Sequence, residues 1–261
     1  MAPTFRPGKS ATILFNNVDM GSVSREVSVD ASVAELDTTV FGNNDETVIA
    51  GVRGASISVS GLYDGTALST ASTASTGAFD HRWAAALGAS TQPILTIGVD
   101  GTTIGRRARL VKAEVTGYTA QAPADGVVQF TAAAKVSGRH DFGVFLHSLK
   151  AETASSTGFT AVNSGITGGT TGGGVGHFHM TAASTVATFQ AKVQHSSAGV
   201  SWADLITFSS STGTTGAGAV QRSTVAGTVK QYTRGQLTTF TGGTGKTATF
   251  AIAFARRRYP I

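Results

Sequence analysis

Two histidines in the sequence H-F-H, His177 and His179, have the spacing that brings alternate side chains to one face of a β-strand. Such a pair can supply two imidazole nitrogens to a metal ion, but a site needs at least a third ligand. No carboxylate lies within twenty residues on either side, and only a hairpin would bring His195 near. We therefore expect no metal, and both histidines on the outer face of a strand, opposite Phe178 and Met180.

The stretch Gly242–Thr247 reads G-G-T-G-K-T and is similar to a phosphate-binding loop. That loop requires a glycine six positions before the lysine, where this chain has Phe240, and a helix directly after it. The surrounding sequence has the pattern of strands, so the helix is missing as well. We expect a hairpin turn with a solvated Lys246 and no nucleotide cofactor.

Serine, threonine, histidine and aspartate are all present, as nucleophilic catalysis requires, but the nucleophile-elbow sequence G-x-S-x-G is absent. Most serines alternate with valine on predicted strands, where they form the surface of a sheet. Paired carboxylates for glycoside chemistry have no support in the sequence either. We therefore expect that the chain is not an enzyme and has neither a catalytic residue nor a cofactor.

Acidic residues gather near the N-terminus, where seven of them lie between residues 19 and 46 against Arg25 alone. They are Asp19, Glu26, Asp30, Glu35, Asp37, Asp45 and Glu46. One interpretation is a solvated strand face and loop that keep the protein in solution. A second interpretation, a surface that repels phosphates, depends on the family resemblance described below.

Basic residues gather in the second half, where residues 151–261 hold eight Lys and Arg against Glu152 and Asp204, while residues 1–150 hold 12 against 13 acids. We expect an exterior basic surface of Arg222, Lys230, Arg234, Lys246, Arg256, Arg257 and Arg258. It could meet nucleic acid, an anionic cell envelope or the acidic half of a neighbouring subunit. Specific recognition of nucleic acid has the least support, because no recognition helix is visible.

Two long alternating segments follow one another in the first half. Val27, Val29 and Val33 alternate with polar residues, and after Ala34–Glu35 the apolar side moves to even numbers, which predicts a bulge there. Residues 55–61 form the second strand by the same pattern. Asp30 has the opposite parity to the valines and is expected on the outer face.

The remaining patterns predict an all-β protein with one α-helix. Phe79, Trp83 and Leu87 have helical spacing, and strands are expected over 94–99, 109–118, 127–137 and 142–149. Residues 1–150 are thus predicted to form a β-barrel or sandwich, and residues 151–176 a Gly/Ser/Thr-rich connection. Six further strand candidates between residues 175 and 256 predict a second antiparallel β-sandwich in a domain of residues 151–261.

The composition limits the remaining classes. The chain has 261 residues, no cysteine and only 13% charged residues, so disulfides and thiolate metal sites are excluded. No apolar run approaches the length of about 20 residues that a membrane helix needs, and the N-terminus lacks the apolar core of a signal peptide. We expect folding in a cytoplasm without membrane insertion.

The order "strand, L-D-x-T-x-F-G, acidic loop, G-x-x-G, strand ending in G-x-Y-D" resembles the major tail tube proteins of long-tailed bacteriophages of the siphovirus type. The residues that carry this resemblance are Leu36, Asp37, Thr39, Phe41, Gly42, Gly51, Gly61, Tyr63 and Asp64. The second half is more weakly similar to β-sandwich modules appended to phage structural proteins, over His195–Leu205, Gln221–Arg234 and Phe250–Arg258.

The resemblance implies a virion protein, made in the host cytoplasm, that self-assembles into hexameric rings stacked as the tube through which DNA is ejected. It implies further that Asp30, Glu35 and Asp37 line the channel, that Asp45 and Glu46 lie in a loop between rings, and that the second domain decorates the exterior. The implied partners are further copies of the chain, the tape-measure protein, the tail terminator and distal tail proteins, with DNA passing without specific binding.

The alternative is a binding module: a head-decoration protein, a baseplate component or an adhesin whose sandwich binds carbohydrate or a cell surface. Few aromatic residues suit sugar stacking in the second half, namely Trp202, Tyr232 and Tyr259, and we expect Trp202 in the core.

Overall fold

The computed structural model describes residues 8–40, 45, 47–65, 79–211 and 219–257. Within these ranges the strands join in one antiparallel sheet of 13 strands, which is not closed into a barrel. The predicted helix is present as α1 (Phe79–Ala85), the single α-helix of the described residues. The all-β class with one α-helix is therefore confirmed, whereas the described strands leave the predicted barrel open.

The strands differ widely in length, from two residues in the shortest to 25 in the longest. After a short 3-10 helix (Gly8–Ser10), the first half contains β1 (Thr12–Phe15), β2 (Val18–Asp19), β3 (Ser24–Asp37), β4 (Val48–Leu62), α1, β5 (Ile94–Gly98), β6 (Arg107–Gln121), β7 (Gln129–Val136) and β8 (Asp141–Glu152). The second half contains β9 (Val162–Asn163), β10 (Gly174–Ser196), β11 (Ala203–Thr207), β12 (Ala219–Val225) and β13 (Tyr232–Arg256).

The core of the first half surrounds Trp83, which is fully buried and packs on Phe15 with ring centroids 4.5 Å apart. Alternation on the strands supplies the rest, because Ile57 and Val59 of β4 and the alternate residues of β7 face this cluster while their neighbours face out. All members of the Trp83 cluster, including the partly buried ones, lie between residues 13 and 136.

Two long, bent strands, β10 and β13, organise the second half. They pair along nearly their whole length, and each changes its outer partner on the way: β10 pairs with β12 and then β11, and β13 with β9 and then β8. Positive φ angles at Thr185 and Gly245 accompany the bends. The stretch Gly242–Thr247 therefore lies within β13, which corrects the predicted hairpin turn.

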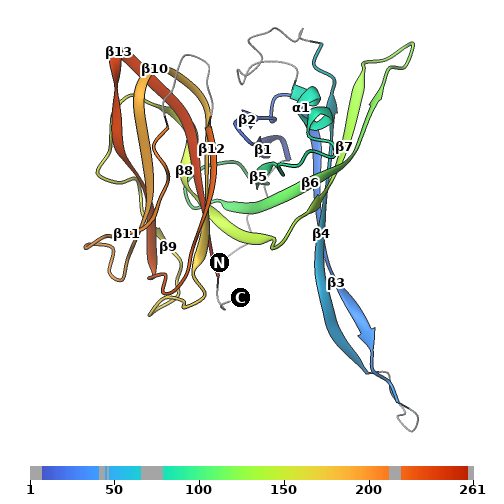
Figure 1. The fold of residues 1–261 in the computed structure, drawn as a ribbon, viewed down its shortest axis with the longest axis horizontal. Coiled ribbons are helices and arrows are strands. Elements are labelled where there is room, and N and C mark those ends of the chain that lie inside the picture. Colours follow the sequence, from blue (N-terminus) through green and yellow to red (C-terminus); the bar gives the residue numbers. More distant parts are fainter. Residues whose placement is uncertain (1–7, 41–44, 46, 66–78, 212–218, 258–261) are drawn as a thin grey trace.

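The two halves share one sheet. The expected boundary at residue 150 falls inside β8, and β8 pairs with β13. The stretch 151–176, expected as a flexible connection, has backbone hydrogen bonds to β13 and to the residues just before it, such as Phe159 N–H to the carbonyl of Gly235 at 2.8 Å. Figure 1 shows the strands from β8 to β13 on one side and the other elements of the first half on the other side, with the hairpin β3–β4 projecting away from both.

Candidate functional site

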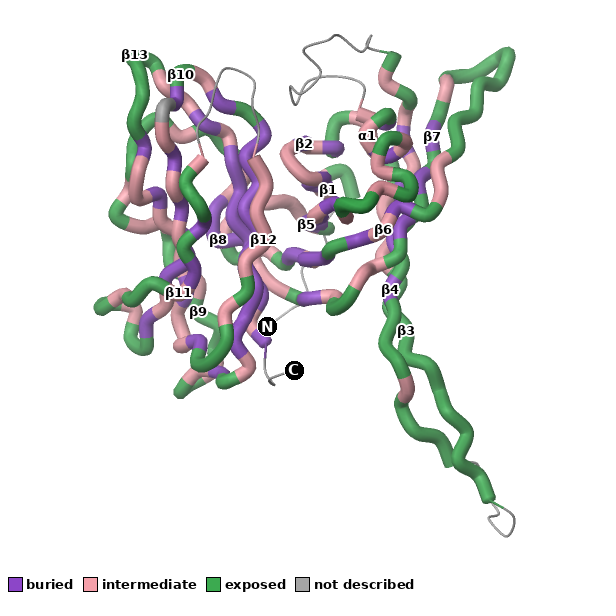
Figure 2. Tube along the Cα trace, in the orientation of Figure 1, coloured by how far each residue is buried: buried purple, intermediate pink, exposed green. Residues whose placement is uncertain are grey.

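The β3–β4 hairpin is the most exposed element of the described chain (Figure 2). Its proximal part belongs to a four-stranded sheet with the order β3-β4-β7-β6, because β7 pairs with β4 over Ser56–Leu62. Among the described residues, those of the distal part, 32–54, pair only with one another, and we call this part the arm. Isolated two-stranded hairpins are at best marginally stable in water, so contacts with another molecule would stabilise the arm.

Apolar side chains on the arm are exposed without cover. Val33, Leu36, Ile49 and Val52 have exposed fractions of 43%, 50%, 55% and 83%. Val48 and Val40 beside them are exposed as well. Soluble monomers seldom present so many neighbouring apolar side chains on one projection, and such patches mark interaction sites.

The three acids expected in a channel lie on both faces of this hairpin. Asp30 lies opposite Ser56, Glu35 opposite Ala50, and Asp37 opposite Val48. The register shift between Val33 and Glu35 is at the predicted position, but β4 advances by three residues there and β3 by two, so the extra residue is in β4. Side chains along β3 therefore keep their alternation, which places Glu35 and Asp37 on the face opposite to that of Asp30.

The face of the four-stranded sheet that carries Asp30 also carries small polar side chains. Ser58, Thr131 and Ala133 are exposed there, and each lies opposite a residue of similar size on the neighbouring strand. Lys135, which lies opposite both Ser56 and Glu114, is the basic residue of this group. The opposite face, with Ile57 and Val59, packs on the Trp83 cluster. The outer face of the sheet is thus polar, mostly small and acidic along β3.

Asp37 is held as an anion by its own turn. The hydroxyl of Thr39 lowers the pKa of this carboxyl, and the backbone N–H of Thr39 adds a hydrogen bond of 2.8 Å. Asp45 is exposed at the end of the arm, and Glu46 lies outside the described residues. The carboxylates of Asp37 and Asp45 are therefore available to solvent or to another molecule.

Two edges of the four-stranded sheet are unpaired within the described residues. β3 pairs with β4 alone, and β6 beyond Thr116 pairs with β7 alone. Each edge presents a row of N–H and C=O groups without strand partners, which is a template for pairing with another chain.

Two residues that carry the sequence resemblance, Gly61 and Asp64, have structural roles. A Cβ on Gly61 would meet the carbonyl oxygen of Val23 at 2.3 Å. Asp64 accepts a hydrogen bond of 3.2 Å from Phe79 N–H at the start of α1.

The residues expected on a basic exterior surface are in fact divided between structural roles and solvent. Arg257 is buried and paired with Asp141, so it is not on the exterior. Arg256 donates to the carbonyl oxygens of Val229, Lys230 and Gln231. Burial of the guanidinium lowers its pKa. Arg257 was misassigned because a sequence cannot show which cation meets a buried acceptor, whereas Arg256 is partly exposed.

Four other basic residues are half-buried. Arg222 lies 3.7 Å from Asp141, whereas Arg234 stacks on Trp202 at 4.1 Å from the ring centroid. Lys246 lies 5.9 Å from the ring of Phe240, and Lys230 shows its side chain partly to solvent. Arg258 lies outside the described residues. Of the six described residues of this set, Arg257 is thus buried and the other five are partly exposed.

His177 and His179 are fully buried, which corrects the expected outer position. Both bond to Thr96 of β5, with Oγ1 at 2.9 Å from His177 Nδ1 and at 2.8 Å from His179 Nε2. His179 Nδ1 lies 2.5 Å from the carbonyl oxygen of Asn16, so this nitrogen carries the proton. The Thr96 hydroxyl then donates to His179 and accepts from His177.

Burial keeps both histidines neutral. It lowers the pKa of His179 to about 4 and that of His177 well below its ordinary value, and His179 and Arg222 nearby lower the latter further. The pair joins β10 of the second half to β1, β2 and β5 of the first. Within the described residues no group of three His, Asp or Glu side chains is placed to hold a metal ion, and no helix is long and apolar enough to span a membrane.

Comparisons with known proteins give a likeness in structure only. No family model and no curated protein matches the sequence. The chain is similar to the tail protein of an empty gene transfer agent particle with C6 symmetry, at 15% identity and a TM-score of 0.41, over 53% of this chain and 98% of that one.

Two further structures come from phage SPP1. Its tail tube protein matches at 14% identity and a TM-score of 0.37, over 51% of this chain and 77% of that one. Its Dit protein, a hub of the adsorption apparatus, matches at 12% identity and 0.36, over 95% and 99%. These proteins come from the class of assemblies that the sequence resemblance names, and they include tube and hub proteins alike. Because the TM-scores are low, we infer function from the chain's own geometry.

Proposed function

We propose that the chain is a structural protein of a phage tail and that its copies join edge to edge into a ring. The observation that carries this proposal is the pair of unpaired edges on the sheet β3-β4-β7-β6. If the β3 edge of one copy pairs with the β6 edge of the next, the contact is heterologous, and repetition of such a contact closes a ring when the rotation permits.

The polar face of that sheet would then form the wall of a central channel. The opposite face packs on the Trp83 cluster, so in the four-stranded sheet only the face with Asp30 can turn toward a lumen. Glu35 and Asp37 lie beyond this sheet on the arm, where they would add carboxylates to the channel where the arm continues along it. Carboxylates along a narrow channel repel the phosphates of DNA, and small hydroxyl side chains offer no strong binding group. DNA would pass without adhering.

The arm reaches beyond the four-stranded sheet and is long enough to contact a second ring. Fifteen residues of β4 extend along the hairpin, but only those from Ser56 onward have a second strand partner. The exposed Leu36 and Ile49 would be buried against another copy, which removes apolar surface from water. We assign Asp45, at the end of the arm, to a contact between stacked rings, and the same role is proposed for Glu46, which lies outside the described residues.

The second half, residues 151–261, would lie outside this ring. It contacts the first half through β8, β10 and β13, on the side away from the unpaired β3 edge (Figure 1). We further propose six copies per ring, as the family resemblance implies, with tape-measure, terminator and distal tail proteins as partners in the virion.

Electron microscopy of the concentrated protein tests the proposal. Stacked rings with a central channel support a tube, single discrete rings support a hub, and monodisperse monomers at every concentration would contradict assembly by this sheet.

A second measurement tests the free edge of β6. Thr119→Pro and Ala120→Pro each remove one N–H, and because successive N–H groups point to opposite sides of a strand, one removal affects the free edge of β6 and the other affects β7.

The variant that retains the circular dichroism and melting temperature of the wild type is the informative one of the two. We expect it to remain a monomer. Rings formed as readily by this variant as by the wild type would exclude pairing along β6.

A further inference from the structure

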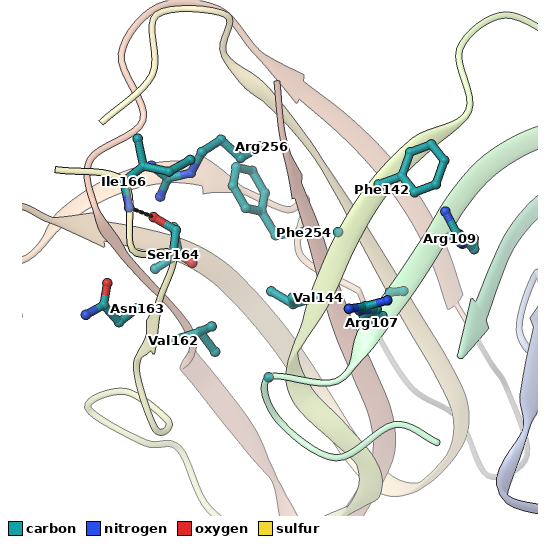
Figure 3. Close-up of a pocket in the computed structure, with 14 residues that line it drawn as sticks. Arg107, Arg109, Phe142, Val144, Val162, Asn163, Ser164, Ile166, Phe254 and Arg256 are labelled. Carbon is teal, nitrogen blue, oxygen red and sulfur yellow. Dashed lines mark hydrogen bonds between the residues drawn. The ribbon is translucent and has the colours of Figure 1, made fainter. Parts of the chain in front are cut away.

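A cavity of about 590 Å³ opens between two walls of the sheet at the junction of the halves (Figure 3). One wall carries Arg107, Arg109, Phe142 and Val144 from β6 and β8. The other carries Phe254 and Arg256 of β13 with the segment around β9, from Val162 to Ile166. The volume is within the range of pockets that hold small ligands, roughly 300–1,000 Å³.

Two arginines of β6 give the cavity unbalanced positive charge. Arg107 is exposed and has no ion-pair partner among the described residues, and the residues that line the cavity include no carboxylate. Arg109, two residues further on the same face, has a buried Nη1 without a hydrogen-bond partner in the described chain. Burial and the charge of Arg107 lower the pKa of Arg109, so each guanidinium would gain from a bound anion.

An aromatic platform lies next to these cations. Phe142 is 62% exposed, and the guanidinium of Arg109 lies over its ring at 4.0 Å from the centroid. His140 stacks on the same ring with centroids 4.5 Å apart. Large exposed aromatic side chains held in one orientation are a surface on which the apolar face of a ring can pack.

The opposite wall is fixed in position. The guanidinium of Arg256 is bound by the carbonyl oxygens of Val229, Lys230 and Gln231, so it forms a rigid side of the cavity and has little left to offer a ligand. Phe254 and Val144 form an apolar floor. The cavity therefore combines an apolar floor, an exposed aromatic ring and two cations on one side, with no carboxylate among the residues that line it.

We propose that this cavity binds an acidic saccharide, with the carboxylate or phosphate group held by Arg107 and Arg109 and a sugar ring packed against Phe142. The guanidinium fork matches both anions in geometry, and the apolar face of a sugar ring packs on an exposed aromatic side chain. A concave cavity of this size holds one or two sugar units better than the flat surface of a folded protein. This binding is independent of ring formation and adds a ligand to the proposed structural role.

Isothermal titration of the full-length protein tests the proposal with four probes: trigalacturonate, glucose 1-phosphate, neutral maltotriose and inorganic phosphate. We expect the first two to bind and maltotriose not to bind. The variants Arg107→Gln and Arg109→Gln should each weaken binding about tenfold, the scale of one hydrogen bond to a charged group. Arg53→Gln on the arm, which removes the same charge far from the cavity, should leave binding unchanged.

Phe142→Leu separates the saccharide from a bare anion. It should weaken trigalacturonate and leave any binding of inorganic phosphate as it was. Binding of maltotriose equal to that of trigalacturonate, an effect of Arg53→Gln as large as that of Arg107→Gln, or no binding of either acidic probe would each overturn the proposal. Loss of rings in the Arg107→Gln variant would identify the cavity as a contact between copies instead. If this variant forms rings and binds the acidic saccharides as tightly as the wild type does, the structural role stands and the ligand proposal is rejected.

Discussion

Asp141 of β8 accepts two hydrogen bonds from Arg257, from Nε to Oδ1 at 2.9 Å and from Nη2 to Oδ2 at 2.8 Å, and both side chains are buried. Arg222 of β12 and Arg139 approach the same carboxylate at 3.7 and 3.2 Å. The Asp141 hydrogen bonds raise the pKa of Arg257. One buried carboxylate thus connects β8 of the first half to two segments of the second.

Asp141→Asn should therefore destabilise the protein strongly. The substitution leaves buried arginines without a counter-charge, and breaking a buried pair in this way costs about 3–5 kcal/mol of unfolding free energy. Urea denaturation measures the change. Arg139→Gln is the matched control, because the side chain of Arg139 is 41% exposed and its loss should cost less than about 1 kcal/mol. Equal effects of the two substitutions would show that Asp141 does not join the halves.

Stability should fall as the pH falls below the ordinary pKa of histidine. His179 has its pKa lowered from 6.5 to about 4, so between these values the unfolded chain binds a proton that the folded chain does not. Each such histidine lowers the unfolding free energy by about 1.4 kcal/mol per pH unit, and for His179 the total is roughly 3 kcal/mol by pH 4. The contribution of His179 is fully present above pH 6.5 and is lost through that window, and His177 acts in the same direction.

Denaturation at a series of pH values checks this, with His179→Gln as the variant. We expect the variant to be less stable at pH 7.5 and to have a smaller slope between pH 6.5 and pH 4. A variant slope identical to that of the wild type would mean that His179 does not titrate in this range. Because His140, His147 and His195 also have lowered pKa values, part of the slope should remain in the variant.

Reversal of charge at the three acids of β3 should change DNA binding without changing the fold. Asp30, Glu35 and Asp37 are exposed, and substitutions at such positions usually alter stability by less than about 0.5 kcal/mol. In the variant Asp30→Lys, Glu35→Lys, Asp37→Lys, the assembled protein should bind labelled double-stranded DNA in a fluorescence anisotropy assay, and the binding should weaken steeply with salt. The wild type should not bind.

The single variants Asp30→Lys and Asp125→Lys give a charge-matched comparison, because Asp125 is exposed in the turn between β6 and β7. Only the first should increase DNA binding if the outer face lines a channel. Loss of assembly in the triple variant would place the three acids in a contact between copies.

The two halves should fold separately once their shared contacts are replaced. The Trp83 cluster lies wholly within residues 1–150, which supports folding of that piece, but the cut exposes Leu146 and leaves Asp141 without Arg257. We expect Asp141→Asn with Leu146→Gln to raise the melting temperature and solubility of the piece 1–150, while the same pair of substitutions destabilises the full chain. Destabilisation of both, or a piece without a cooperative transition, would argue that the halves are one folding unit.

The amino-acid sequence alone determined the faces of the first-half strands. The alternation at Val27–Val33 and the outer position of Asp30 follow from a period of two residues, which is a local property of the chain. The irregularity predicted at Ala34–Glu35 is present as a register shift, but its extra residue lies in β4. The helix at Trp83 follows from helical spacing in the same way. These strands were predictable because a strand with one buried face and one exposed face has alternating apolar and polar residues in its sequence.

Only the tertiary structure decided the positions of His177, His179 and Arg257. Residues 175–181 of β10 are all buried, because one face packs on the second-half core and the other is covered by β5 and the turn after β1. A strand covered on both faces has no alternation to reveal which polar residues are inside. The arginine cavity arises in the same manner, since it is formed by β6, β8 and β13, whose meeting depends on contacts between residues more than one hundred positions apart.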